Sequence, residues 1–237
     1  MSEEIKLRFP ASVFRGLLLD LEDSFRSEAL KAHKMVRDHS GLDKKRGREL
    51  EGQARFRMME KGFQETCEAH GGLLLANGIL PQTDLKIFQP FIRFEHMGKG
   101  TILGLAAIPE PSVLPVKNKS RLAGVSLNYN LLPTLDIDGR GPRVGDVFVV
   151  LLVSRDRDRA GLLEEIAIGV TSSKYDQYLF YEPLEKYLGD AAKAPEGSAI
   201  APSSGTVSVP IIRLKPSVRP YIPPETPKKV EKEKDAE

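Results

Sequence analysis

A dense run of cationic side chains is the strongest candidate for binding chemistry in this sequence. The segment GLDKKRGREL (41–50) places four basic residues within five positions, directly after an Asp that can begin a helix. Such side chains can contact the phosphate oxygens of a nucleic acid or the carboxylates of an acidic protein partner. The predicted binding residues are Lys44, Lys45, Arg46, Arg48, Arg55 and Arg57.

The place of these cations in their helix bears on their role. The first turn of a helix carries the positive end of the helix dipole, so cations there do not stabilise the helix. Their position therefore favours phosphate contact, a loop conformation or no specific role. The alternative is a solvated helix face on which the cations partly pair with Glu49 and Glu51.

A second group of residues suggests a metal-dependent nuclease or phosphodiesterase. Asp136 and Asp138 alternate with apolar residues, so both carboxylates should project from one face of a strand. With Glu164 or Glu165 they could hold two metal ions. The acid-x-Lys sequence of such a nuclease core is not found, however, because Ala167 stands two positions after Glu165. An exposed strand face that ends in a turn explains the two Asp residues better.

Three further motifs are better explained by structure than by chemistry. LDIDG (135–139) does not fit an EF-hand loop, since Gly stands where the last ligand, Glu, is required. MGKGT (97–101) ends like a phosphate-binding P-loop, but Arg93 replaces the earlier Gly and the segment joins two expected strands. Cys67 and His70 lack a second pair at metal-ligand spacing. We therefore predict no metal and no cofactor, and we do not expect an enzyme.

Two other segments could serve contacts with proteins. Residues 154–161 (SRDRDRAG) alternate in charge and predict a solvated hairpin loop, with a partner contact as the alternative. Residues 174–187 concentrate tyrosines, which are enriched at interfaces and equally common at the rim of a β core. These tyrosines are Tyr175, Tyr178, Tyr181 and Tyr187.

The composition is that of a globular protein. The 237 residues are 41% hydrophobic and 29% charged, which suits one substantial domain. The single cysteine excludes an intramolecular disulfide framework and fits a reducing compartment. The sequence shows no secretory signal and no apolar run of about 20 residues, so we expect a cytoplasmic protein that does not contact a membrane.

The net charge of +2 hides an unequal distribution along the chain. Residues 26–62 carry eleven Lys and Arg against six Asp and Glu, whereas residues 122–190 carry seven against eleven. A basic half can mark a polyanion-binding element. It can equally be meant for an acidic protein face, including that of a neighbouring copy, so a homo-oligomer is a further expectation.

Apolar residues at spacings of three and four predict two helices in residues 1–75. The first runs from near Ser12 to the DHSG segment (38–41), and the second from Asp43, its N-cap, to His70. Glycines within the second helix lower its propensity by about 1 kcal/mol each relative to Ala. The two helices should therefore form a packed hairpin.

Residues 76–214 are expected to form an antiparallel β-rich region, one domain with the helices. Alternation at 124–132 predicts a half-buried strand with Ser126, Asn128 and Asn130 on its polar face. The other expected elements are a hairpin of 85–96 with 101–108, a hairpin of a central strand at 147–154 with 165–173, a strand entering a short helix at 178–188, and a last strand at 206–214.

The fold class that follows is α+β, with an N-terminal helical hairpin packed on a mainly antiparallel β-sheet and a disordered C-terminal tail at 215–237. The function that the sequence favours is a non-catalytic interaction protein. Its basic helical region would contact nucleic acid or another anionic partner, and its sheet would mediate assembly. The alternatives are the metal-dependent nuclease or phosphodiesterase and a structural subunit of a bacterial or phage assembly.

Overall fold

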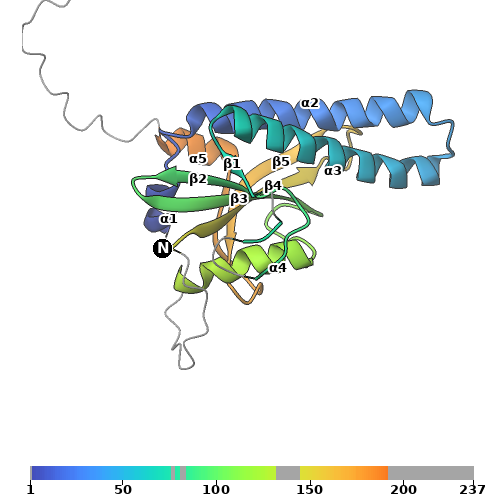
Figure 1. The fold of residues 1–237 in the computed structure, drawn as a ribbon. Coiled ribbons are helices and arrows are strands. Elements are labelled where there is room, and N and C mark those ends of the chain that lie inside the picture. Colours follow the sequence, from blue (N-terminus) through green and yellow to red (C-terminus); the bar gives the residue numbers. More distant parts are fainter. Residues whose placement is uncertain (1, 76–77, 81–83, 132–144, 192–237) are drawn as a thin grey trace, which may run out of the picture. The chain divides into compact units, whose positions relative to one another are not determined.

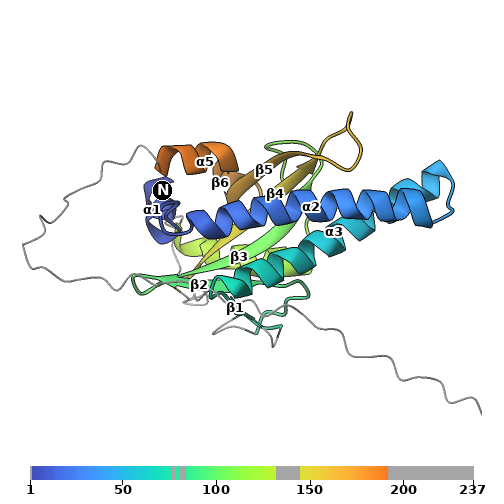
Figure 2. The ribbon, with the colours of Figure 1, turned by 90° about the horizontal axis from the view of Figure 1, so that it is seen from above.

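The computed structural model describes residues 2–75, 78–80, 84–131 and 145–191, in which helices pack on a six-stranded sheet (Figures 1 and 2). The helices are α1 (Ser2–Arg8), α2 (Arg15–His39), α3 (Lys44–Ala69), α4 (Lys119–Ser126) and α5 (Leu184–Ala191), with a 3₁₀ segment η1 (Leu127–Leu131). The strands are β1 (Leu73–Leu74), β2 (Ile92–His96), β3 (Lys99–Ile108), β4 (Val147–Arg155), β5 (Leu163–Thr171) and β6 (Tyr178–Pro183). The predicted helical hairpin on a mainly antiparallel sheet is confirmed. The strand expected at 206–214 and the tail at 215–237 lie outside the described residues.

The six strands lie in the sheet in the order in which they occur in the chain. Four of the five neighbouring pairs are antiparallel, and only β3 and β4 run parallel, with Thr101 opposite Val147 and Ile108 opposite Ser154. A parallel pair needs a crossover connection, and here the chain leaves the sheet through α4 and η1 before it returns as β4. The sequence patterns did not predict this parallel pair.

The α2–α3 hairpin begins and ends as its capping residues dictate. Asp43 is the N-cap of α3, as predicted, and its carboxylate accepts hydrogen bonds from the backbone N–H groups of Lys45 and Arg46 at 3.0 and 3.1 Å. The first long helix, in contrast, begins at Arg15 rather than near Ser12, and no side chain caps its N-terminus. No side-chain cap therefore marks the start of α2. The sequence feature that defines this helix is its buried apolar stripe from Leu17 to Val36.

Strand β4 is the centre of the core, because apolar side chains cover both of its faces. Its alternate residues from Val147 to Val153 pack under α1, α2, α3 and α5. The residues between them, Phe148, Val150 and Leu152, belong to a second cluster on the opposite face, beneath α4. The predicted central strand is thus confirmed, and the sheet is a middle layer between two helical layers (Figure 1).

The strand predicted at 124–132 is wrong, because this segment forms the end of α4 and η1. Asn118 starts α4 by accepting a hydrogen bond from the backbone N–H of Arg121 at 2.8 Å, a local signal that outweighs the alternation. Asn128, expected on an exposed polar face, is fully buried. Its amide bonds the N–H and C=O of Phe148 and the C=O of Thr171 at 2.8–3.1 Å. Asn128, one of the polar residues of the alternating pattern, is therefore a buried residue that holds η1 to the strands by hydrogen bonds.

We expect Asn128→Ala to destabilise the protein strongly, because it leaves three buried backbone groups of β4 and β5 without partners. Each unsatisfied buried group costs about 1–3 kcal/mol, so the free energy of unfolding should fall by at least about 2 kcal/mol. Urea denaturation measures this loss. An Asn128→Ala protein of unchanged stability would show that η1 is not anchored in this way.

The crossover helix approaches the sheet closely at the ring of Phe148. A Cβ atom at Gly124 in α4 would lie 2.7 Å from this ring, and one at Gly104 in β3 would lie 2.9 Å from it. Such distances are shorter than van der Waals contact, so both positions must lack a side chain. Gly52 in α3 differs, because nothing lies within 4 Å of the place where its Cβ would be.

Two Gly→Ala variants in helices should therefore change stability in opposite directions. Gly124→Ala forces an overpacked contact with Phe148, which typically costs about 1–3 kcal/mol. Gly52→Ala meets open space and should gain up to about 1 kcal/mol of helix propensity. Thermal unfolding of both variants beside the parent protein tests the pair, and equal shifts in Tm would contradict the close packing of α4.

Candidate anion-binding surface

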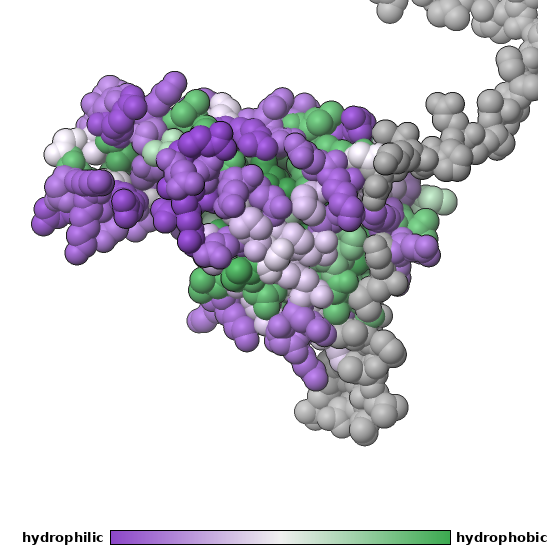
Figure 3. Space-filling model, turned by 180° about the vertical axis from the view of Figure 1, so that it is seen from behind, coloured by the Kyte–Doolittle hydropathy of each residue, from purple (hydrophilic) through white to green (hydrophobic). Residues whose placement is uncertain are grey.

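The six predicted cations lie on α3, and four of them lie in its first turns, at the end of the hairpin. Figures 1 and 2 show the α2–α3 connection extending past the strands of the sheet, so these turns project away from the core. Figure 3 shows this end of the hairpin, seen from behind, as a mostly hydrophilic surface. The fold therefore presents the basic segment to solvent instead of burying it against the sheet.

Lys44, Lys45 and Arg48 are exposed, and within the described parts of the chain none of them has an acidic side chain within 4 Å. The other three predicted cations are paired. Arg46 contacts Asp43 at 2.5 Å, Arg55 contacts Glu51 at 3.5 Å, and Arg57 contacts Glu60 at 2.7 Å. The structure thus divides the predicted set into three uncompensated and three compensated cations.

Arg55 and Arg57 do not belong to the same surface as the other four residues. Only 13% of the Arg55 side chain is exposed, and its burial lowers the pKa of the guanidinium, which Glu51 partly offsets. Arg57 is exposed but lies nine residues beyond Arg48, about 14 Å along the helix. These two predicted residues are therefore separated from the basic end of α3.

A cation from α2, Arg37, joins this surface and was not in the predicted set. It lines one groove together with Lys44 and Arg48, formed where the last turn of α2 meets the first turns of α3, and it pairs with its neighbour Asp38 at 2.7 Å. Nothing in its local sequence marked it, because its nearness to Lys44 depends on how the hairpin closes. We define the hairpin tip as Arg37, Lys44, Lys45, Arg46 and Arg48.

Two acidic residues at the hairpin tip, Asp43 and Glu51, are engaged within the protein, whereas the exposed Glu49 forms no ion pair among the described residues and lines a pocket with Lys44, Lys45 and Arg48. The Asp43 carboxylate accepts a backbone and a side-chain bond from Arg46, and these lower the pKa of Asp43. Glu51 lies between Nδ1 of His33, at 3.1 Å, and Arg55. Asp43 and Glu51 therefore do not compensate Lys44, Lys45 and Arg48, and Glu49, which forms no ion pair with them in the described structure, can offset only part of their charge.

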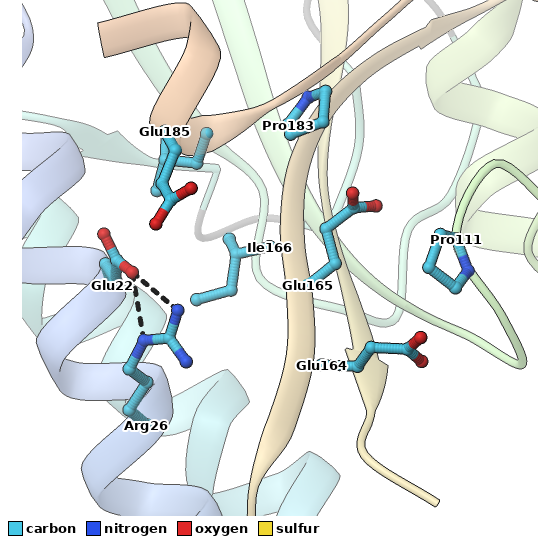
Figure 4. A pocket seen from close by; sticks show the side chains of 9 residues that line it. Glu22, Arg26, Pro111, Glu164, Glu165, Ile166, Pro183 and Glu185 are labelled. Atoms are coloured by element: carbon cyan, nitrogen blue, oxygen red, sulfur yellow. Dashed lines mark hydrogen bonds and ion pairs between the residues drawn. The ribbon is translucent and has the colours of Figure 1, made fainter. Parts of the chain in front are cut away.

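The acidic residues of the nuclease alternative lie elsewhere and are only partly described. Glu164 and Glu165 of β5 line a pocket with Glu22 of α2 and Glu185 of α5 (Figure 4). Arg26 lies in the same pocket and is hydrogen bonded to Glu22 at 2.7 and 3.0 Å. In the described residues, no three His, Cys, Asp or Glu side chains group as metal ligands would. Asp136 and Asp138 lie outside those residues, so the nuclease alternative stays a prediction.

The tyrosine-rich segment is largely internal. Tyr175 and Tyr187 are buried, so they cannot form the interface that the sequence suggested. Tyr178 and Tyr181 are half-buried, with ring centroids 5.0 Å apart. The Tyr178 hydroxyl donates to the backbone carbonyl of Val113, and the Tyr181 hydroxyl donates to Glu165. These two tyrosines hold a loop and a neighbouring strand against β6, which is a structural role.

The residues of the remaining sequence motifs are buried or are bonded to other residues of the protein. Cys67 lies in the core, where burial raises the pKa of its thiol, and His70 is hydrogen bonded to Asp20 at 2.7 Å. In the charged loop at 154–161, Arg159 pairs with Asp156 and Arg157 pairs with Glu110. None of these contacts joins the hairpin tip.

Comparison of the chain with protein families, with curated proteins and with solved structures found no match. Among the described helices, none is both long and apolar enough to cross a membrane.

Alkaline pH should destabilise the protein through its half-buried phenols. Burial, and then the hydrogen bond to Glu165, raise the pKa of Tyr181 to about 12, whereas an unfolded tyrosine titrates near about 10. The stabilisation is therefore complete below pH ~10 and is lost as the pH rises towards ~12. Urea midpoints at pH 9 and pH 11 should differ, and Tyr181→Phe should reduce the difference. Equal pH dependence in both proteins would contradict this account.

Proposed function

We propose that the chain is a non-catalytic interaction protein that binds the phosphate backbone of nucleic acids through the hairpin tip. The observation that carries this proposal is that Lys44, Lys45 and Arg48 are exposed together at one end of the hairpin without acidic partners. Internal ion pairs account for Asp43 and Glu51, and Glu49 forms no ion pair with the three cations in the described structure. The proposal concerns phosphate contact, because nothing in these side chains favours one base over another.

The helix dipole strengthens the case for an external anion. Cations in the first turn of a helix lie near the positive end of its dipole, so their charge slightly opposes helix formation. Lys44 and Lys45 occupy this turn without an acidic residue, although the Asp43 carboxylate caps the helix directly before it. A bound phosphate would interact favourably both with the cations and with the dipole.

The projecting position of the hairpin tip also suits a long, charged partner. Both sides of the groove contribute cations, the unpaired Lys44 and Arg48 from α3 and, from α2, Arg37, which is paired with Asp38. Lysine and arginine contacts of this kind are independent of base sequence and release counterions, which makes affinity fall with salt. Assembly of copies through the sheet remains a prediction, to which the buried Tyr175 and Tyr187 cannot contribute.

The triple variant Lys44→Ala, Lys45→Ala, Arg48→Ala should lose nucleic-acid affinity on all sequences alike. Each phosphate contact contributes about 0.7–0.9 to the slope of log K against log salt concentration, so the slope should fall by roughly 2–3. Fluorescence anisotropy with labelled single- and double-stranded DNA and RNA, from 50 to 200 mM salt, measures both quantities.

A matched control removes the same charge elsewhere. Lys61, Lys86 and Lys99 are exposed and lie outside the hairpin tip, so their triple Ala variant should keep the parent affinity. An equal loss of affinity in both variants would show that binding depends on the net charge of the protein and not on the position of these cations. Salt-independent binding, or binding only to an acidic polypeptide such as polyglutamate, would rule out nucleic acid as the partner.

A further inference from the structure

Apolar side chains are exposed around the beginning of α4. We define the apolar patch as Phe88, Val113, Val116 and Leu122, which are 70%, 42%, 76% and 44% exposed. Two hydrogen bonds hold its most exposed members beside the helix. The N–H of Phe88 donates to the Ser120 hydroxyl at 2.7 Å, and the carbonyl of Val116 accepts from Arg121 at 2.6 Å. A group of exposed apolar side chains of this kind is typical of a surface that another molecule covers.

The loop that carries Val113 and Val116 runs beside β6. At its beginning, the N–H of Ser112 donates to the Tyr181 hydroxyl at 2.9 Å. At its end, the Nζ of Lys117 lies 5.9 Å from the centroid of the Tyr175 ring. Tyr181 belongs to β6, whereas Tyr175 lies in the turn before this strand, so the loop passes along β6 against its chain direction. The two ends of the loop therefore lie at different ends of one surface.

Glutamates lie at the beginning of the loop. Glu164 and Glu165 line one pocket with Pro111, the residue before Ser112 (Figure 4). Glu164 is exposed and forms no ion pair among the described residues, and Glu165 accepts a hydrogen bond from the Tyr181 hydroxyl. Two neighbouring cations already have carboxylate partners, namely Arg157 with Glu110 and Arg26 with Glu22. We call Glu164 and Glu165 the acidic end.

Lysines lie at the other end of the loop. Three of them are exposed and form no ion pair in the described parts of the chain, and we call them the basic end: Lys117, Lys119 and Lys174. The nearby Asp176 is hydrogen bonded to Ser172. Asp84 and Lys86, on the segment that leads to Phe88, have opposite charges and add no net charge. The apolar patch thus lies between an acidic end and a basic end.

We propose that this surface joins two copies of the chain in a symmetric dimer. In a two-fold interface a patch meets the same patch of the other protomer. The apolar patch then packs on its own copy, and the basic end of each protomer meets the acidic end of the other. Both charge contacts are attractive because the two ends carry opposite charges. The interface uses none of the residues of the hairpin tip and is independent of nucleic-acid binding.

The charge arrangement favours a second copy over other partners. An acidic protein or an anionic membrane would be attracted by the basic end but repelled by the acidic end of the same surface, and like charges brought together in an interface are costly. A copy of the chain related by a two-fold axis presents the opposite charge at both ends. The surface is therefore complementary to itself.

Sedimentation of the nuclease-treated, full-length protein over a range of concentrations tests the dimer. The parent should pass from the mass of one chain to the mass of two, and no further. Val116→Asp places a charge in the apolar patch and should raise the dissociation constant about tenfold or more. Val13→Asp is the matched control, because Val13 is 56% exposed before α2 and lies outside the surface, so this variant should dimerise as the parent does.

Charge reversal tests the pairing of the two ends. A variant with Lys117→Glu and Lys119→Glu should dimerise weakly, because its reversed end meets the acidic end of its copy. Glu164→Lys should dimerise weakly for the converse reason. An equal mixture of these two variants should associate more tightly than either alone, since both charge contacts of the mixed dimer are again attractive. All the changed side chains are exposed, and circular dichroism checks that each variant is folded.

Several results would overturn the proposal. They are a parent that stays monomeric at all concentrations, a dimer that Val116→Asp leaves unchanged, and reversed variants that do not associate when mixed. Binding of a monomeric parent to vesicles of phosphatidylcholine and phosphatidylserine, or to polyglutamate, would assign the surface to a membrane or to an acidic protein instead. The triple variant of the hairpin tip should lose nucleic acid but keep the dimer, so the two proposals can fail separately.

Discussion

The burial of β4 on both faces is the constraint on which the rest of this structure depends. The side chains on both faces of β4 are apolar. Neither face can be exposed to water, so the sheet needs a covering layer on each side. The α2–α3 hairpin with α1 and α5 covers one face, and α4 and η1, together with Leu80, Ile87 and Phe91 of the β1–β2 connection, cover the other. The parallel pairing of β3 and β4 follows from this need, because the crossover between them is what carries α4 to the second face.

The lengths of the elements explain why part of the hairpin is left without a sheet to cover. Helix α2 has 25 residues and α3 has 26, which corresponds to nearly 40 Å, whereas the nine residues of β4 extend about 30 Å. The two helices differ in how far their buried residues extend: those of α2 continue to Val36, whereas those of α3 begin only at Met59. The first turns of α3 therefore bury no side chain, and their residues are free to be selected for charge and for contacts outside the chain.

Sequence reasoning worked where a pattern was long or where a cap was local. The helical periods of α2 and α3, the cap at Asp43 and the doubly apolar β4 were all readable, because each depends on residues close together in the chain. The segment 124–132 failed because Asn128 serves backbone groups of β4 and β5, which are distant in sequence. A polar residue in an alternating pattern indicates exposure only when no distant backbone group needs it.

Charge compensation, more than charge density, separates the candidate sites from ordinary surface. The density of basic residues in the sequence placed Arg55 in one group with Lys44. In the structure Arg55 is paired with Glu51, because residues four apart lie next to each other on a helix. Arg121 is the opposite case: it is a single cation in an unremarkable segment, and only the fold shows that it is buried with no acidic side chain within 4 Å among the described residues. Sequence lists the charges of a chain, but the fold decides which of them remain uncompensated, and it is the uncompensated ones that can bind an anion.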